Sequence, residues 1–351
     1  MERKAKGLVR TAGRVTMRDV ARLAEVSLGT VSRVVNENPS VARDARDRVL
    51  KAIDRLGWRP NAVARSMRTA TTRTIGCIVP DIRNPLFAGI VKGAEEVLSD
   101  RGYTLMVANS DEKPLQDRKL INLFMQRRTD GLLLAPTDDT DPQTQATIRE
   151  IGVPTVLVER DLPTYLDSVA SDQSNGIQSA VNYLFSLGHE RIALVTGSRR
   201  NRAGRERHRG FLRAFEGAGR RVDPGLLRLE SFSADYAYRE TLDLLGMREP
   251  PTAMIVAGSF MLAGVLRATS VRGRRVPDDL SVISTGDTDL AELAPPSFTV
   301  IRWDLAQLGR EAATLLLDRL AGPAGPYEAK HLQVPTEVVL RRSCAPRTSP
   351  D

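Results

Sequence analysis

The sequence has only two cysteines and three histidines among its 351 residues. Cys77 and Cys344 are 267 positions apart, without the paired spacing of a disulfide framework or a structural zinc site. No run approaches the ~20 apolar residues that span a bilayer, and the basic start MERKAKGLVRTAGR lacks the apolar core of a signal peptide. These absences predict a protein of the reducing cytoplasm, without a metal site and without membrane contact.

Sequence patterns of enzymes are missing as well. No GxxxxGK, GxSxG or HExxH motif occurs, and His189, His208 and His331 are scattered along the chain. Carboxylates crowd residues 137–141, TDDTD, but a solvated acidic loop accounts for them better than an acid–base pair. We therefore expect neither enzymatic activity nor a cofactor.

Positive charge is present in excess, and it lies at one end. Residues 1–73 hold 17 Lys and Arg against 7 Asp and Glu, a net charge of +10, whereas residues 74–351 hold 34 against 36, a net charge of −2. A basic head on a near-neutral body is typical of nucleic-acid binding. A solvated basic tail without a partner is the alternative that charge alone leaves open. Residues 1–14 are expected to be a disordered basic tail.

Three short helices are predicted within residues 15–60. Thr16 and Asp19 have the spacing of a capping box at the start of the first, and Ser27 is placed to cap the second. The third is expected from about residue 42 to 56, where apolar residues recur at steps of three and four. Two helices joined by a tight turn form a helix-turn-helix, which places its second helix in the DNA major groove. A small bundle made soluble by its arginines is the alternative.

The second helix begins with the residues that should reach base edges. Arg33 is the only one that can make the bidentate contact with guanine O6 and N7, and Leu28 can contact a thymine methyl group. Gly29 has no side chain, which indicates a close backbone approach or weak reading at that base. The DNA-binding residues predicted in this segment are Thr16, Ser27, Leu28, Gly29, Thr30 and Arg33.

A linker of residues 61–73 follows. Its first part, NAVARSMR, predicts a helix of about two turns after Pro60, too short to be stable alone in water. We expect this segment to order only when something packs on it.

Residues 15–69 resemble the DNA-binding head and hinge of the lactose-repressor/galactose-repressor family of bacterial transcription factors. The D-V-A, V-S-x-x-T-V-S-R and R-P-N-x-x-A-R-S patterns occur in order, and the resemblance extends to about Ser343. It implies a homodimer whose hinge helices fold on a pseudo-palindromic operator, and it adds Asn61, Arg65 and Met67 to the DNA-binding residues. Met67 stands where the family usually has the leucine that wedges into the minor groove. Glu25 stands where the family often has glycine, so a left-handed backbone there would cost about 1 kcal/mol.

From residue 74 onward, strands and helices alternate. Strands are predicted at 75–80, 103–109, 131–136 and 155–159, with helices at 87–101 and 115–127. The alternation recurs with strands at 192–197, 228–231, 253–257 and 281–284 and helices at 205–218, 236–245 and 260–268. This pattern predicts parallel sheets with crossover helices, so the fold class is α plus α/β. The resemblance implies that residues 74–343 form two doubly wound subdomains of the periplasmic-binding-protein type, with a ligand cleft between them and a tail at 344–351.

The resemblance also assigns candidate effector-binding residues. Phe87 follows the first strand of the body, although a core position under the helix is an equal alternative. Arg207 matches an arginine that binds polar groups of the effector, with chance exposure among neighbouring arginines as the alternative. Phe232, Asp172 and Asp287 match further ligand-lining positions.

Two positions of the family's ligand set lack their usual side chains. Gly258-Ser259 replaces Asn-Asp, and Gly286 replaces an aspartate. Because a hydrogen-bonding site that loses its partners discriminates against the old ligand, the effector need not be an ordinary sugar. Several arginines near the cleft would accept a phosphate or a carboxylate.

The sequence therefore predicts an operator-binding transcriptional regulator, a repressor under allosteric control by a sugar or related metabolite. The sign of regulation depends on where the operator lies relative to the promoter, so an activator stays open. A periplasmic-type solute-binding protein is the alternative from another class, against which the basic head argues. The carboxyl end lacks the leucine heptads of a tetramerisation coiled coil, so a homodimer is expected.

Overall fold

The computed structural model describes residues 15–35, 38–58, 71–258, 260–322 and 327–347. The chain forms two compact units, residues 1–72 and residues 73–351, which we call the head and the body. Each unit has its own hydrophobic core.

The head contains the three predicted helices, α1 (Met17–Leu23), α2 (Leu28–Val35) and α3 (Arg43–Leu56). The Thr16–Asp19 capping box starts α1, and the Ser27 hydroxyl accepts a bond from the Thr30 backbone N–H at 3.1 Å at the start of α2. The apolar faces of the helices enclose a core that includes Val20, Val31 and Val49, which are buried. Local capping and periodicity therefore specify the helix-turn-helix.

The turn between α1 and α2 is left-handed at Glu25, with φ of 53°. The chain closes there because the Val26 N–H bonds the Ala21 carbonyl at 3.1 Å. A side chain in this conformation costs about 1 kcal/mol, since its Cβ crowds the following carbonyl. The turn is thus kept at a local cost that glycine would avoid.

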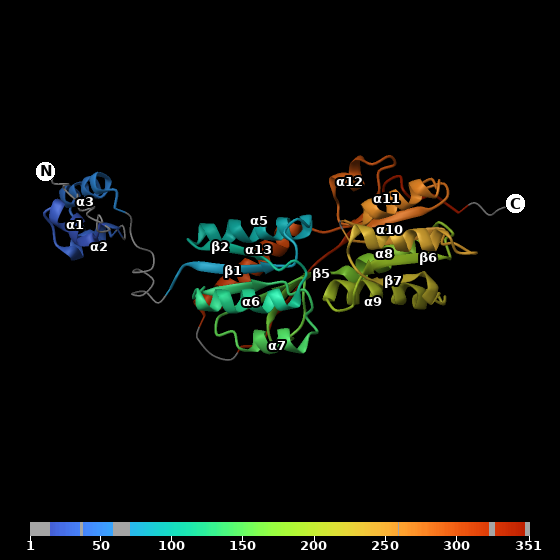
Figure 1. Ribbon diagram of the computed structural model, residues 1–351, viewed down its shortest axis with the longest axis horizontal. Coiled ribbons are helices and arrows are strands. Elements are labelled where there is room, and N and C mark those ends of the chain that lie inside the picture. The colour runs from blue at the N-terminus through green and yellow to red at the C-terminus, as the bar shows by residue number, and fades with distance from the viewer. Residues whose placement is uncertain (1–14, 36–37, 59–70, 259, 323–326, 348–351) are drawn as a thin grey trace, which may run out of the picture. The chain divides into compact units, whose positions relative to one another are not determined.

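The body consists of two lobes, each a sheet covered by helices on both faces (Figure 1). The first lobe has a parallel sheet of order β11-β5-β4-β3-β1-β2. Helices α5 and α13 cover one face of this sheet, and α6 and α7 cover the other. Its elements are β1 (Thr74–Val79), α5 (Pro85–Asp100), β2 (Thr104–Asn109), α6 (Pro114–Gln126), β3 (Gly131–Leu134), α7 (Pro142–Arg149), β4 (Thr155–Val158), β5 (Asp167–Ser171), α13 (Leu305–Ala321) and β11 (His331–Val334).

The second lobe repeats this plan with order β12-β10-β9-β8-β6-β7, in which only the β10–β12 pair is antiparallel among the described strands. Helices α8 and α9 pack as one layer, and α10 and α11 as the other (Figure 1). Its elements are α8 (Gln173–Ser186), β6 (Ile192–Gly197), α9 (Arg202–Gly217), the 3-10 helix η1 (Pro224–Leu226), β7 (Leu227–Glu230), α10 (Ala234–Leu245), β8 (Ala253–Ala257), α11 (Met261–Val271), β9 (Ser281–Thr285), α12 (Asp289–Leu293), β10 (Thr299–Arg302) and β12 (Glu337–Val339).

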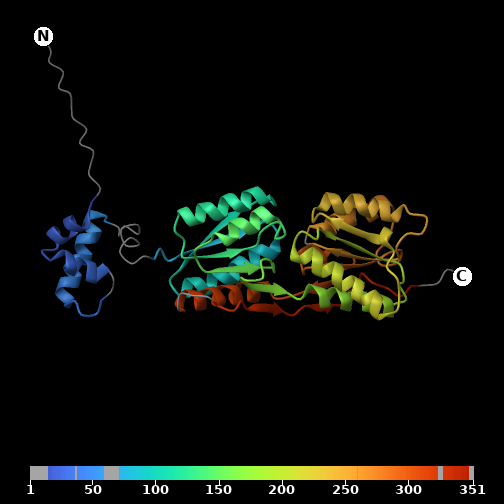
Figure 2. The ribbon, with the colours of Figure 1, turned by 90° about the horizontal axis from the view of Figure 1, so that it is seen from below.

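The chain passes between the lobes after β5, after β10 and after β11, and the three passages lie beside one another in both views (Figures 1 and 2). The carboxyl ends of strands from both lobes therefore face one region, where open parallel sheets bind ligands. This arrangement is what positions the site described below.

The predicted alternation of strands and helices is confirmed, with element ends displaced by no more than three residues. The local sequence pattern did not predict strand β5, because DSVAS has no apolar periodicity. It is nevertheless buried along its whole length. The carboxylate of Asp167 is compensated there by Arg319, whose Nε and Nη2 donate to it at 2.6 and 2.9 Å. The buried strand is thus stabilised by an ion pair with a residue far along the chain, which no local sequence pattern indicates.

Residues 344–347, which the sequence assigned to a tail, are held on the second lobe. The His189 ring bonds the Ala345 carbonyl at 3.1 Å, and the Arg347 N–H bonds the Leu187 carbonyl at 2.8 Å. Among the described residues, no helix has the length and apolar character needed to cross a membrane.

Candidate functional sites

The start of α2 presents the predicted base-reading residues on the surface of the head. Leu28 is 46% exposed, and Gly29 and Arg33 are also exposed. The Arg33 Nε donates to the Gly29 carbonyl at 3.3 Å, which leaves both terminal nitrogens of its guanidinium fork for another acceptor. The buried face of the same helix fixes this orientation, because Val31 and Val34 lie in the core.

The other predicted DNA-contacting residues fall into two groups, three hydroxyl side chains of the head and three residues of the hinge. The Ser27 and Thr30 hydroxyls contact each other at 2.9 Å, and the Thr16 hydroxyl donates to Asp19 at 2.6 Å. These three side chains stabilise the starts of α1 and α2. The predicted hinge residues Asn61, Arg65 and Met67 lie outside the described residues.

A cavity of about 320 Å³ lies between the two lobes of the body. Residues that follow the carboxyl ends of strands in both lobes line it, as the topology requires. Its volume falls within the usual range for small-molecule sites. The lining residues used in the argument below are Phe87, Asp138, Arg160, Arg200, Arg207, Phe232, Asp287, Arg302 and Trp303.

Aromatic rings form part of the cavity wall. Phe87 is only 5% exposed and belongs both to the first lobe's core and to the cavity lining, so the two alternatives from sequence are combined in one residue. Phe232 lies against Gly197, where a Cβ atom would come within 2.1 Å of the ring. The Trp303 indole N–H is buried and has no hydrogen-bond partner among the described residues. Aromatic side chains thus form part of the cavity lining.

Arg207 is the most unusual charge in the cavity. Its side chain is almost fully buried, its Nε donates to the Gln173 amide oxygen at 2.8 Å, and its Nη1 donates to the Ala257 carbonyl at 3.0 Å. No carboxylate of the described chain lies within ion-pair distance of it. Burial lowers the pKa of Arg207 to about 10, a fall that the more distant Glu159 only partly offsets. The guanidinium is thus a desolvated cation with donors to spare.

The Arg207 guanidinium also lies over the Phe232 ring, 5.5 Å from its centre. Helix α9 can bring Arg207 this deep because Gly210, one turn later, allows close packing on α8. A Cβ at Gly210 would come within 2.1 Å of the Ser174 carbonyl oxygen. The alternative of chance exposure among neighbouring arginines is wrong, since Arg207 is among the most buried arginines described.

The two predicted aspartates have different surroundings. Asp287 lines the cavity, and its carboxylate is held by Arg341 at 2.7 Å and Arg302 at 3.6 Å. Asp172 is not among the cavity-lining residues. Its carboxylate instead caps α8 by accepting a bond from the Asn175 backbone N–H at 3.2 Å.

Sequence reasoning missed several lining residues, including Arg160 and Trp303. Arg160 is buried and donates to the Pro136 and Glu159 carbonyls at 2.5 and 2.8 Å. Burial lowers its pKa against the opposing charges of Asp139, Glu159 and Asp117. Arg160 lies two residues after β4, and Trp303 directly follows β10. The strand-end rule applied to the predicted strand 155–159 would have found Arg160, whereas Trp303 follows a strand that the sequence analysis did not predict.

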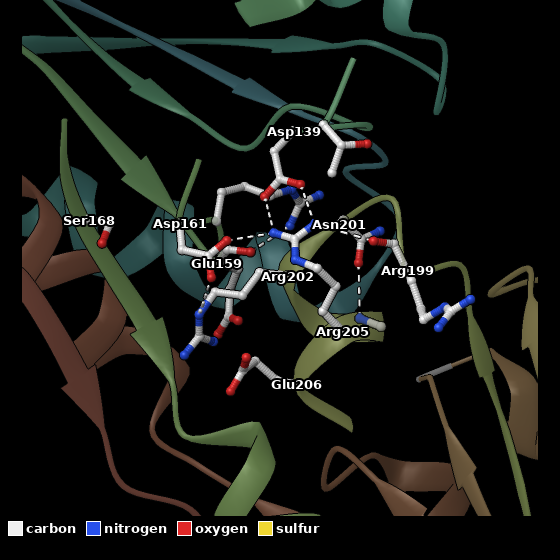
Figure 3. A network of polar contacts seen from close by, with 12 residues as sticks. Asp139, Glu159, Asp161, Ser168, Arg199, Asn201, Arg202, Arg205 and Glu206 are labelled. Atoms are coloured by element: carbon white, nitrogen blue, oxygen red, sulfur yellow. Dashed lines mark hydrogen bonds and ion pairs between the residues drawn. The ribbon is translucent and has the colours of Figure 1, made fainter. Parts of the chain in front are cut away.

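A second cluster of charges joins the lobes beside the cavity (Figure 3). Arg205 of α9 binds both carboxylate oxygens of Asp139 at 2.7 and 2.9 Å and also Asp161 at 2.5 Å. Arg202 donates to the Ser171 carbonyl at 2.8 Å. Among the described residues no group of His, Cys, Asp and Glu side chains is arranged to hold a metal ion.

Comparison with known proteins gives matches in both units of the chain. Residues 16–61 match the lacI family of bacterial regulatory proteins, and residues 181–344 match a periplasmic binding protein-like domain. The HTH-type transcriptional repressor PurR of Haemophilus influenzae (strain PittEE) is 30% identical over 93% of this chain and 98% of its own. The HTH-type transcriptional regulator DegA of Bacillus subtilis (strain 168) is 31% identical over 95% of this chain and 99% of its own.

Solved structures of the same architecture are similar as well. The Lac repressor dimer bound to operator and the anti-inducer ONPF has a TM-score of 0.84 and 27% identity, over 94% of this chain and 99% of that one. The transcriptional regulator CelR–cellobiose complex has a TM-score of 0.72 and 32% identity, over 94% of this chain and all of that one. These relatives are transcriptional regulators that match head and body together.

Proposed function

This chain belongs to the lacI family of DNA-binding transcriptional regulators, and from that premise we propose that it represses transcription by binding a pseudo-palindromic operator as a homodimer. A small-molecule effector in the cavity between the lobes controls the binding. The observation that carries the proposal is the presence, in one chain, of an exposed recognition helix and a cavity lined by a buried, unpaired cation. A solute-binding protein would need only the second feature. We place the protein in the cytoplasm, where the DNA is.

We infer the chemistry of the effector from Arg207. A cation that is buried without a carboxylate partner gains most from a ligand that brings the opposite charge. The rings of Phe87, Phe232 and Trp303 offer apolar surface to a sugar-sized ring. A sugar phosphate or a sugar acid combines these properties better than a neutral sugar does. The effector contacts that we propose are Phe87, Arg207, Phe232 and Asp287. Asp172 acts indirectly, because it caps α8.

The homodimer is supported by an apolar edge on the first lobe. Strand β2 lies at the edge of the sheet and exposes Met106 and Val107, which are 44% and 42% accessible. Leu115 and Leu123 on the following helix α6 are also exposed. An edge strand with exposed apolar side chains invites pairing unless something covers it. A second copy of the chain is the partner that a dimeric operator-binding protein supplies.

The effector assignment is tested by an Arg207→Ala variant titrated against operator DNA. Neutral sugars, sugar phosphates and sugar acids are added in separate arms. If the effector releases the repressor, the variant binds operator within about tenfold of wild type and no longer responds, a lost coupling of about 1–3 kcal/mol. If the effector is a corepressor, the variant loses operator binding in every arm.

Arg209→Ala is the matched control, because Arg209 lies on the same helix with its side chain 61% exposed and contacts only Glu206 among the ion pairs described. It should respond as wild type does. A normal response from Arg207→Ala would remove Arg207 from the effector site.

A further inference from the structure

Arg205 joins the two lobes through two carboxylates of the first lobe. Its guanidinium faces Asp139 with a fork of two hydrogen bonds, and one of the two nitrogens also reaches Asp161 (Figure 3). Asp139 follows β3 and Asp161 follows β4, whereas Arg205 lies in the first turns of α9 in the second lobe. We call these three residues the interlobe clasp.

The clasp holds loops that themselves line the cavity. The Asp139 backbone N–H donates to the Arg200 carbonyl at 3.1 Å, and Arg205 donates to the Arg199 carbonyl at 3.2 Å. Asp138 and Arg200, each next to one of these contacts, line the cavity from opposite lobes. Arg205 therefore supports the loops that line the cavity, although it is not itself a lining residue.

The geometry makes this clasp stronger than an ordinary surface ion pair. The Asp139 side chain is fully buried, and Arg205 is only 25% exposed. Exposed pairs contribute little, whereas a buried carboxylate deprived of its partner is left uncompensated. Burial by itself would lower the pKa of Arg205, but the hydrogen bonds and charges of Asp139 and Asp161 outweigh it and raise the pKa above its usual value. Arg205 stays charged at every pH at which the protein is folded.

Resting on the function proposed above, we propose that Arg205 is a positioning residue of the effector site, which keeps the lobes closed against each other before any effector binds. The effector then binds to a cavity whose lining is already in place before binding. Because operator affinity depends on the arrangement of the lobes, the clasp also sets the affinity of the effector-free protein for its operator. Weakening the clasp shifts that resting state, whichever direction the effector acts in.

Pulsed electron–electron double resonance on the full chain without effector measures the distance between one spin label on each lobe. Spin labels are attached to cysteines replacing Ala146 on α7 and Arg213 on α9, both exposed, in a Cys344→Ser background. Excess unlabelled protein ensures that each dimer carries at most one labelled subunit. The wild-type clasp should give one narrow distance, and Arg205→Gln should add a broad population at longer distance.

Two further variants separate the clasp from general stability. Asp161→Asn keeps the buried Asp139–Arg205 pair and should produce a smaller shift in the same direction. Glu240→Gln removes an ion pair with Arg228, at 2.6 Å and of similar exposure, that lies wholly within the second lobe. It should leave the interlobe distance unchanged even if it lowers the melting temperature. An Arg205→Gln distribution identical to wild type, or a broad one already in wild type, would overturn the proposal.

Operator affinity supplies the second readout, with DNA selected from random sequence by the wild-type protein. Effector-free Arg205→Gln should differ from wild type by at least about fivefold in Kd, and Glu240→Gln should stay within about twofold. If wild type selects no sequence, the proposed function itself fails. If wild type binds and Arg205→Gln matches it in both distance and affinity, the clasp alone fails.

Discussion

Arg33 has no neighbour in α2 that duplicates its chemistry. The other exposed residues at the helix start carry an isobutyl group, a hydrogen atom or a hydroxyl. Arg33→Ala should therefore cost about 1–3 kcal/mol per half-site and relax the preference at one symmetric base pair. Site selection from random DNA, compared with wild type, measures both effects.

Arg55→Ala provides the control, because Arg55 is also an exposed cation and lies in the last turn of α3. It should weaken binding evenly across sequences and leave the selected site unchanged. An unchanged base preference in Arg33→Ala would show that α2 is not the reading helix.

His189 makes a residue-scale prediction about acid stability. Its Nε2 donates to the Ala345 carbonyl at 3.1 Å, and its Nδ1 lies 2.9 Å from the Thr252 hydroxyl. Burial lowers the pKa of His189 below its value of about 6.5 in the unfolded chain. Below pH ~6.5 the unfolded state therefore binds more protons than the folded state, and the free energy of unfolding falls as the pH drops toward the folded pKa.

The measurement is urea unfolding of the body at steps between pH 7.5 and 5. Wild type should lose more stability over this range than His189→Gln, which has no proton to take up. Above pH ~6.5 the difference between the two proteins should be constant. Parallel pH profiles throughout would mean that His189 does not contribute to the acid sensitivity.

At the scale of elements, strand β2 carries the prediction about assembly. Burying a methionine contributes about 1.5–3 kcal/mol, and a two-fold interface uses each residue twice. Met106→Lys should therefore convert the dimer to monomers at micromolar concentration, as measured by light scattering after size exclusion. Leu212→Lys on α9, a residue of similar exposure at 40%, should leave the mass unchanged. A dimeric Met106→Lys protein would place the interface elsewhere.

Elements also differ in how far local sequence specifies them. Helices α1 to α3 carry caps and apolar periodicity in their own sequences, and β6 and β8 are apolar runs bounded as expected. Strand β5 and the long helix α13 were not expected, because one is polar and the other follows a passage between lobes. Their structure depends on partners far along the chain, such as the Asp167–Arg319 pair. Local patterns therefore predict an element only where its stability does not depend on contacts with residues far along the chain.

At the scale of the whole molecule, the division of charge predicts how salt acts. The net charge of +10 lies in residues 1–73 and the remainder is nearly neutral, so DNA attraction comes from the head. With six to ten phosphate contacts, operator affinity should fall by roughly 10³–10⁵ between 50 and 200 mM salt. Fluorescence anisotropy at several salt concentrations gives the slope. Effector binding by the body, measured with a ligand found active in the operator titrations, should change far less, and a slope near zero for DNA would contradict the charge assignment.

The sequence by itself determined the division into a basic head and a near-neutral body, the helix-turn-helix and the alternation of strands and helices. Capping, periodicity and charge balance are properties of neighbouring residues, so they can be read without a fold. The prediction that Arg33 reads a guanine edge is of the same kind, since it rests on the chemistry of that one side chain.

Only the tertiary structure decided which side chains meet. The Asp139–Arg205 pair joins residues 66 positions apart. Arg160 and Trp303 line one cavity although they lie far apart in the sequence, and Asp172 caps a helix instead of lining the cavity. The physical reason is that the sheets fix where each strand-end loop lies, while burial determines which charges must find a partner. Neither the distance between two loops nor the depth of a guanidinium is encoded in any local pattern, so Arg207 could be named from sequence but its isolation among carbonyls could not.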